Sequence, residues 1–281
     1  MKLSKRAGLS VAELVVGILI LGIVGLALTR IMVAQARYFD HQKKSNLARN
    51  VSRGPLNRVV SDLRMVEALG GVESATATAI TVRVPYAIGI VCVSNLATGT
   101  HLSMLPVDSA MYAGPGYSGY AWRNGAGKYG YVESGTLTND GTLSLCNTAG
   151  VSTLTADQAK VVRIYPKLTD TASVGTPVFF FRKILYEFKN STAVPGTIGL
   201  YRTIVATGAT EELSAPYENT AKFRFFVGNS TVAQDAVPAQ LSTLRGLELN
   251  MTGVSERIPA GGTQKERAPF TTAVFFKNRL N

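Results

Sequence analysis

The distribution of apolar residues divides the chain into an N-terminal helical part and a larger part made of short strands. Leu9–Leu28 is apolar apart from one charged residue, Glu13. About twenty residues at 1.5 Å each form a helix roughly 30 Å long, which is enough to cross the core of a bilayer. Apolar residues then recur at spacings of three and four as far as Leu69, so we expect the helix to continue beyond the membrane. Gly54 and Pro55 interrupt it, because proline lacks a backbone donor, unless Pro55 begins a second helix.

After Gly71 the period changes to two, with many β-branched and aromatic residues. This pattern is typical of strands, and the segments that show it are Ala79–Pro85, Gly89–Ser94, Gly141–Cys146, Val161–Tyr165, Val178–Phe188, Ile198–Ala206, Ala221–Phe226, Leu244–Met251 and Thr271–Lys277. Asn190–Gly196 has the composition of a turn between two of them, which predicts an antiparallel hairpin. No segment of this part has a sustained helical period. We therefore predict an α+β fold, in which an antiparallel β-rich head packs on the C-terminal half of one long helix.

These patterns divide the 281 residues into three parts. Residues 1–8 form a short basic leader, and residues 9–70 form the helix, with a membrane-spanning segment at 9–29. Residues 71–281 form a globular head. About 210 residues are enough for one domain with a substantial core or for two small ones.

The formal net charge is +11, and the leader carries three of the positive charges, on Lys2, Lys5 and Arg6. The other basic residues are dispersed without a run of like charge, which indicates solvated surface. A basic surface attracts anionic partners in general. However, no sequence motif supports a nucleic-acid partner.

The single charge inside the apolar segment indicates a function. A carboxylate at the centre of a membrane costs about 2.5–3.5 kcal/mol, so Glu13 needs a partner. The plain alternative is an ordinary signal anchor that tolerates this charge. A cleaved secretory signal fits poorly, because Thr29–Met32 follows the apolar segment where a small-residue cleavage motif would be expected.

Ser4–Leu14 has the order basic residues, glycine, apolar residue, small polar residue, two apolar residues, glutamate and leucine. This order resembles the type III signal of type IV pilins and type II secretion pseudopilins. The resemblance implies that a prepilin peptidase cuts between Gly8 and Leu9 and methylates the new amino terminus, although Leu9 stands where phenylalanine is usual. It also implies that Glu13 compensates the amine of a neighbouring subunit during assembly. Four residues span about 6 Å of helix, so we expect Glu13 to pair poorly with the amine of its own chain.

Three stretches of the head resemble the minor pilins called PilW-like and the J-type minor pseudopilins. These stretches are Arg182–Phe188, Gly199–Arg202 and Leu244–Met251. They follow that subgroup's order of an aromatic-rich strand, a Leu-Tyr-Arg strand and a late Arg-Gly-Leu-Glu-Leu strand. Pro55–Leu69 resembles the corresponding end of the stalk helix, whereas residues 95–160 have no such match.

The resemblance implies a pilin-like fold and the role of a minor pilin or pseudopilin in a tip or priming complex. Such a complex helps to initiate assembly of a type IV pilus or a type II secretion pseudopilus. The implied partners are the prepilin peptidase, other minor pilins or pseudopilins, the major pilin filament and the inner-membrane assembly platform. The protein would cross the bacterial inner membrane once, with the leader cytoplasmic and the head extracytoplasmic, and then move to the filament tip. A tip-exposed binding module for adhesion, DNA uptake or secreted substrates is the alternative.

Cys92 and Cys146 are the only cysteines. In an oxidising compartment outside the cytoplasmic membrane, two cysteines indicate one disulfide. Closing a loop of about 54 residues would contribute on the order of 4 kcal/mol in the chain-entropy model. Two unrelated buried thiols are the alternative, because spacing alone does not fix the geometry.

Tyr112–Tyr131 is unusually rich in tyrosine and glycine. One interpretation is an exposed loop in which Tyr117, Tyr120 and Trp122 contact a partner, since these side chains supply rigid contact area. The other is a long glycine-rich hairpin whose aromatic side chains lie on the head's own sheet.

Nothing in the sequence indicates an enzyme, a cofactor or a metal site. His41 falls on the predicted helix and His101 in a predicted loop, and neither lies beside a nucleophile motif. Neither histidine forms a zinc-ligand pattern with a cysteine. Asn139 and Asp140 resemble turn residues rather than part of a calcium loop. We therefore predict a non-catalytic protein without a cofactor.

Overall fold

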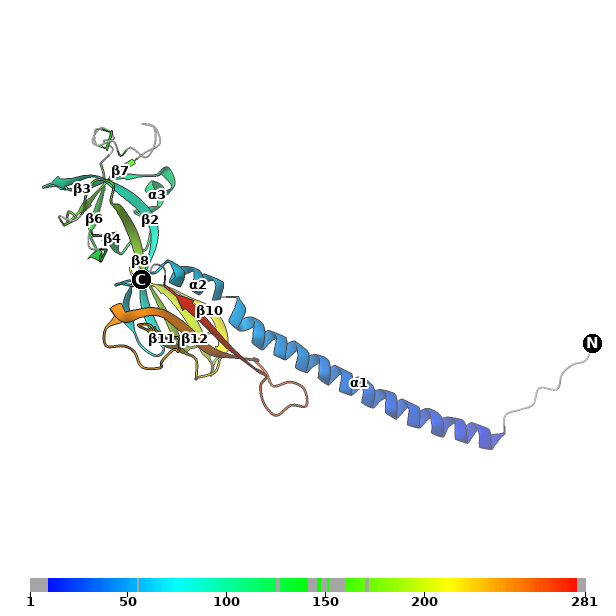
Figure 1. Cartoon of the computed structure of the whole chain (residues 1–281). Coiled ribbons are helices and arrows are strands. Elements are labelled where there is room, and N and C mark those ends of the chain that lie inside the picture. Colours follow the sequence, from blue (N-terminus) through cyan, green and yellow to red (C-terminus); the bar gives the residue numbers. More distant parts are fainter. Residues whose placement is uncertain are drawn as a thin grey trace, which may run out of the picture.

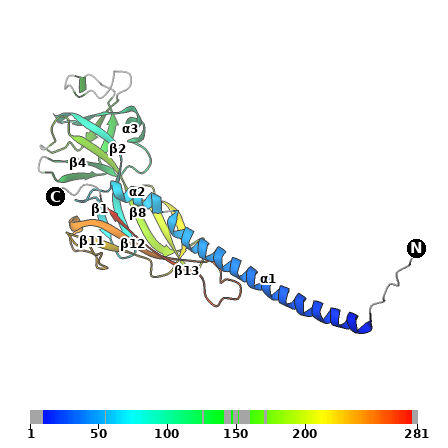
Figure 2. The same cartoon turned by 45° about the vertical axis from the view of Figure 1, so that its right-hand side comes forward.

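The computed structural model describes residues 10–54, 56–124, 127–140, 146–147, 151, 160–169 and 172–276. The fold is α+β: a long helix projects from a head built on a large antiparallel sheet (Figure 1). The head has two lobes stacked along its length, which a second view also shows (Figure 2).

Two helices form the N-terminal part, α1 (Val11–Arg53) and α2 (Leu56–Met65). They meet on either side of the break predicted at Gly54 and Pro55, and Pro55 itself lies outside the described residues. The amide of Gly54 donates to the carbonyl of Asn50, which closes the last turn of α1.

The amphipathic pattern of α2 places one face against the sheet. Leu56, Val59 and Leu63 are buried on that face, at the spacings of three and four expected for one side of a helix. They join a core that includes Phe223 and Phe225. Burying each such side chain contributes about 1.5–3 kcal/mol, so α2 is an integral part of the head.

The described strands of the head are thirteen in number, all antiparallel to their neighbours. They are β1 (Val72–Ala75), β2 (Ala79–Leu96), β3 (Gly99–Met104), β4 (Gly119–Arg123), β5 (Tyr129–Glu133), β6 (Thr136–Asn139), β7 (Lys160–Tyr165), β8 (Pro177–Asn190), β9 (Ile198–Ile204), β10 (Ala209–Tyr217), β11 (Lys222–Val227), β12 (Leu244–Val254) and β13 (Arg267–Phe275). The main path has the order β11-β12-β10-β9-β8-β2-β3-β7-β6. A short helix, α3 (Pro106–Met111), and a 3₁₀ turn, Leu241–Thr243, complete the elements.

Two long strands, β2 and β8, run through both lobes and join them. They pair from Ala79 opposite Glu187 to Ile90 opposite Pro177. The proximal lobe, nearer α1, contains α2, β1, β9–β13 and the adjoining halves of β2 and β8 (Figure 1). The distal lobe contains α3, β3–β7 and the other halves of these two strands (Figure 1). Each lobe has its own core, and the distal core includes Trp122.

The sequence pattern separated Ala79–Pro85 from Gly89–Ser94, but both lie in the single strand β2. The pairing with β8 shifts between Pro85 and Ala87, and such a bulge reverses which side chains face inward. The alternation therefore breaks although the strand continues. The predicted strand Gly141–Cys146 lies outside the described residues except for Cys146, which is not in a strand.

Several elements were not predicted because they are short or polar. Helix α3 has only six residues, too few for a helical period to show. Strand β10 contains two adjacent glutamates and ends near a proline, a composition that disfavours strands. Strand β10 forms because the neighbouring strand β9 supplies its hydrogen bonds.

The last third of α1 is fastened to the proximal lobe. The Tyr217 hydroxyl donates to the carbonyl of Val51 at 3.1 Å. The connection between β12 and β13 extends along α1, where the amide of Ala260 donates to Asp40 at 2.7 Å. His41 Nδ1 lies 2.9 Å from Glu266 Oε1. These contacts orient the head relative to the helix.

Candidate functional site

The N-terminal half of α1 projects away from the head without covering (Figure 1). Its apolar side chains are exposed, for example Ile18 at 63% and Leu21 at 72%. This helix is long and apolar enough to cross a membrane, and its most apolar window is not buried within the protein. Exposing so many apolar side chains to water would be unfavourable, whereas the hydrocarbon core of a membrane accommodates them.

The first turn of α1 is closed by Ser10 and Glu13. The Glu13 amide donates to Ser10 Oγ at 3.2 Å, and the Ser10 amide donates to Glu13 Oε2 at 3.0 Å. This reciprocal capping box satisfies two of the amides that a helix leaves unpaired at its N-terminus. The predicted processing residues, Gly8 and Leu9, lie outside the described residues.

The capping box changes one expectation about Glu13. Its carboxylate folds back over one turn and reaches the amide of Ser10. Residue 13 lies about 6 Å along the helix axis from residue 9. This separation does not prevent the Glu13 carboxylate from reaching the start of its own helix. Glu13 therefore caps its own helix through Oε2.

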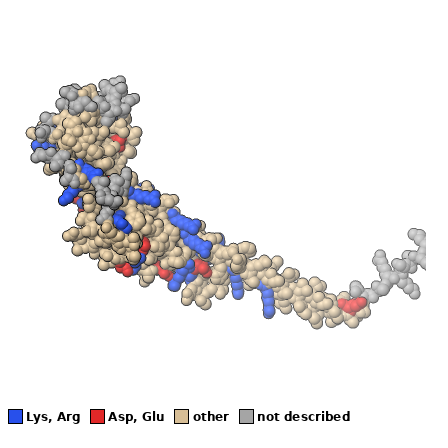
Figure 3. Space-filling model, viewed as in Figure 1, with Lys and Arg blue, Asp and Glu red and all other residues tan. Residues whose placement is uncertain are grey.

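Charged residues begin again beyond the apolar part of α1 and extend to the head (Figure 3). Most of them are basic: Arg30, Arg37, Lys43, Lys44, Arg49 and Arg53. Asp40 is an acidic exception and is bonded to the head. The distribution places one isolated carboxylate at one end of an apolar span and basic residues at the other.

Asp62 of α2, Tyr186 of β8 and Arg202 of β9 meet in one cluster. Asp62 Oδ2 accepts a hydrogen bond from the Tyr186 hydroxyl at 2.5 Å and from Arg202 Nε at 3.2 Å. The Asp62 and Arg202 side chains are only 14% and 9% exposed. Burial raises the pKa of Tyr186, and the neighbouring Asp62 carboxylate raises it further. The sequence pattern put Asp62 on the polar face of its helix, and its enclosure by the sheet carries no sequence signal.

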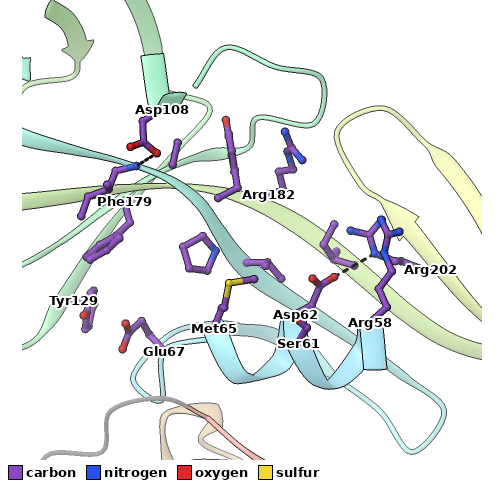
Figure 4. A pocket seen from close by; sticks show the side chains of 16 residues that line it. Arg58, Ser61, Asp62, Met65, Glu67, Asp108, Tyr129, Phe179, Arg182 and Arg202 are labelled. Atoms are coloured by element: carbon purple, nitrogen blue, oxygen red, sulfur yellow. Dashed lines mark hydrogen bonds and ion pairs between the residues drawn. The ribbon is translucent and has the colours of Figure 1, made fainter. Parts of the chain in front are cut away.

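A groove of about 760 Å³ lies at the waist between the lobes (Figure 4). Helix α2 forms one wall, and the crossing strands β2 and β8 contribute much of the remaining lining. We call it the waist groove. Its lining residues are Arg58, Ser61, Asp62, Met65, Glu67, Val84, Pro85, Tyr86, Ala87, Ile88, Asp108, Tyr129, Phe179, Arg182, Ile184 and Arg202.

Cys92 and Cys146 are joined in a disulfide in this structure. Cys92 lies in β2, and both sulfur-bearing residues are buried beside Val161. The bridge therefore fastens the end of β2 to the segment that precedes β7. Of the two alternatives that the sequence left open, the bridged one is present.

We expect loss of this bridge to destabilise the distal lobe by on the order of 4 kcal/mol, the chain-entropy value for a closed loop of about this size. Trp122 is the only tryptophan and belongs to the distal core, so its fluorescence during urea unfolding reports on this lobe. The Cys92→Ser/Cys146→Ser variant should unfold at lower urea than the oxidised protein and match the reduced wild type. Two alkylatable thiols in protein purified under oxidising conditions would contradict the bridge.

The aromatic candidates are not displayed on an exposed loop. Tyr120 and Trp122 lie on β4, which pairs with β5 and β8, and they are 0% and 5% exposed. Tyr117 is half-buried and its hydroxyl donates to the carbonyl of Gly135 at 2.8 Å. The interpretation as a partner-contact loop is therefore wrong, and the hairpin alternative describes the segment. The glycine-rich composition of this segment is compatible with both interpretations, so the sequence did not distinguish between them.

Each of the two histidines lies beside a carboxylate. His101 lies in strand β3 rather than in a loop, and its Nε2 is 2.7 Å from Asp140 Oδ2. No described hydrogen bond of the His101 ring involves a hydroxyl or thiol side chain. Within the described part of the chain, no group of three or more metal-ligating side chains comes together.

Comparisons with profiles of protein families, with curated proteins and with solved structures found no match to this chain.

Proposed function

We propose that this protein is a minor pilin or pseudopilin that helps to initiate a type IV pilus or a type II secretion pseudopilus. The observation that supports this most is the exposed apolar part of α1, with one carboxylate in its first turn. An isolated acidic residue in such a segment is a functional feature by default. The proposal assigns that residue, Glu13, to the recruitment of a neighbouring subunit.

In this account the leader is removed after Gly8 and Leu9 supplies a methylated amino terminus. The helix stays in the inner membrane, with the leader side cytoplasmic and the head outside. A neighbouring subunit's ammonium then meets Glu13 in lipid, where an unpaired charge of either sign is costly. The arrangement of the head supports the proposal, since its sheet covers α2 and contacts the C-terminal end of α1.

The size of the head favours a low-copy subunit. A repeating subunit must pack beside copies of itself many times, whereas a starting complex forms once per filament. The two-lobed head adds a distal lobe that extends away from α1 (Figure 2). Such an extension fits the end of a filament more readily than its repeating wall.

The expected result is that filaments sheared from cells contain this protein in trace amounts relative to the major subunit. Quantitative immunoblotting against a purified standard measures the ratio. Deletion of the protein should reduce the number of filaments rather than their length, because initiation is the affected step. A ratio near one to one with the major subunit would contradict the minor role.

A further inference from the structure

The connection between β12 and β13, residues 255–266, is the part of the head that reaches farthest toward the apolar half of α1 (Figure 1, Figure 2). We call it the β12–β13 loop. Two contacts fix its position along α1. The Ala260 amide donates to Asp40 at 2.7 Å, and Gly261 lies against Arg37, since a Cβ at this glycine would be only 3.2 Å from Arg37 Cδ.

The apolar run and the residues after it offer a membrane two segments of twenty residues. Leu9–Leu28 encloses Glu13. Leu14–Val33 encloses Arg30 and no other charge. Arg30 lies three residues from the end of its segment, about 4.5 Å, a distance that its long side chain can bridge to the headgroups. The second segment also leaves the Glu13 carboxylate at the bilayer surface, where water solvates it, so it is the more favourable one for a single subunit.

The second segment ends with residues that suit the hydrocarbon. The Thr29 hydroxyl donates to the carbonyl of Gly25 at 2.8 Å, so it has a partner within its own helix and needs no water. Ile31, Met32 and Val33 are exposed apolar side chains, and lipid accommodates them better than water does. The outer edge of the hydrocarbon therefore lies near the end of this segment.

The β12–β13 loop then lies at the level of the headgroups. Arg37 is four residues beyond Val33, about 6 Å along the helix, and the headgroup layer on each side of a bilayer is about 5–8 Å thick. Tyr38 and Phe39 lie at the same level and are exposed. Tyrosine is enriched at this depth, and helical side chains lean toward the N-terminus of their helix, which here is toward the membrane.

The loop displays an apolar side chain beside a cation. Arg257 and Ile258 are both exposed, and Ile258 is 50% exposed. Its neighbour Pro259 is buried, so the loop is packed on the head while Ile258 is left outside. Such a pair suits the boundary between headgroups and acyl chains, which takes apolar and basic side chains together.

The charges at this level favour an anionic surface. Residues 37–44 and 255–266 contain five basic and three acidic side chains. Two of the acidic ones already have partners within the protein, since Asp40 accepts from the Ala260 amide and Glu266 lies 2.9 Å from His41. The basic ones form no ion pair with any described residue, and they are Arg37, Lys43, Lys44, Arg257 and Lys265. Basic side chains beside a membrane span attract anionic lipids.

We propose that the β12–β13 loop rests on the membrane surface, with Ile258 in the headgroup layer and the surrounding basic side chains on anionic phospholipid headgroups. The inference rests on the membrane-spanning helix of the proposed function and concerns a single subunit before assembly. In this state the membrane supports the head as well as the helix. The head therefore stays at a fixed height above the bilayer until a neighbouring subunit binds.

The test places one full-length molecule in each lipid nanodisc and attaches an NBD fluorophore to an introduced cysteine. The native cysteines are bridged, so only the introduced thiol reacts. Phospholipids with a nitroxide on the headgroup quench a fluorophore that lies in the headgroup layer. The Ile258→Cys label should be quenched in discs that contain phosphatidylglycerol, and about twofold less in discs of phosphatidylcholine alone, because the basic side chains attract anionic lipid.

The matched control for the label is Val232→Cys. Val232 is exposed on another connection of the proximal lobe, between β11 and β12. The eleven residues of β12, at about 3.3 Å each, separate that connection from the loop, so this label should not be quenched. Arg257→Glu should reduce quenching at position 258 by about half, whereas Arg64→Glu, an equal change at an exposed position of α2, should not alter it.

A Val24→Cys label with the nitroxide on the acyl chains reports on the helix itself, and it should be quenched. If it is, and the label at position 258 is quenched no more than the one at 232, the docking is overturned and the membrane span stands. An unquenched label at position 24 overturns the membrane span of the proposed function and the docking with it. Equal quenching at position 258 with and without phosphatidylglycerol overturns the assignment to anionic headgroups.

Discussion

Replacing Glu13 by alanine is expected to leave cleavage after Gly8 intact and to prevent the protein from joining the other minor subunits. In the proposed processing the scissile bond precedes Leu9, so loss of a carboxylate four residues further on would leave that bond in place. Assembly, unlike cleavage, should be affected, because a neighbouring ammonium would then lie in lipid without a counter-charge. We expect at least a tenfold loss of co-purification from membranes.

Glutamine at position 13 separates the two roles of this side chain. The Glu13 carboxylate caps the Ser10 amide, and glutamine also serves in a capping box but carries no charge. If the charge recruits the neighbour, Glu13→Gln should fail as Glu13→Ala does. Affinity purification of a tagged partner subunit, with immunoblotting for this protein, gives the comparison. Normal recovery of Glu13→Gln together with poor recovery of Glu13→Ala would show that the carboxylate acts only as a helix cap.

Replacing Asp62 by alanine is expected to destabilise the proximal lobe by about 3–5 kcal/mol, the usual cost of removing one member of a buried ion pair. The variant leaves the Tyr186 hydroxyl without its acceptor, and it leaves the buried Arg202 guanidinium with only the half-exposed Glu211, whose Oε1 lies 3.5 Å from Arg202 Nη1. Helix α2 would also lose a fastening to β8 and β9. Urea unfolding followed by circular dichroism measures the change.

The matched control for Asp62 is Asp235, which lies near two cations, Lys222 at 2.9 Å and Arg224 at 3.0 Å. Its side chain is 62% exposed, and exposed ion pairs contribute little. Asp235→Ala should therefore leave the unfolding midpoint unchanged. Equal effects of the two substitutions would show that the Asp62 cluster does not hold α2 against the sheet. The double variant Asp62→Ala/Arg202→Met should recover part of the stability, because it also removes the buried cation that has lost Asp62.

The parts of the fold that follow from the sequence are those with a long, regular period. Helix α1 begins with a long apolar run, the buried stripe of α2 repeats at helical spacing, and β8 alternates over much of its length. Strand β2 was divided in the prediction because its bulge shifts the alternation. Helix α3 was absent from the prediction because six residues show no period.

The candidate functional residues also differ in how far the sequence predicts them. Glu13 stands out in the sequence because it is the one charge in an apolar run, and its local bond to Ser10 follows from the capping-box spacing. The waist groove has no local signal. Arg182 and Tyr86 lie far apart in the chain and meet only because β2 and β8 cross between the lobes.

The N-terminus of the protein isolated from membranes of the cells that produce it tests the central claim most directly. Intact mass and N-terminal peptide sequencing should show a chain that begins at Leu9, carries a methyl group on its amine and lacks residues 1–8. A Gly8→Val variant should keep the leader, because a side chain at position 8 would obstruct access to the backbone at the proposed cut. A wild-type chain that begins at Met1, or that is cut elsewhere, would contradict the account of this protein as a processed pilin-class subunit.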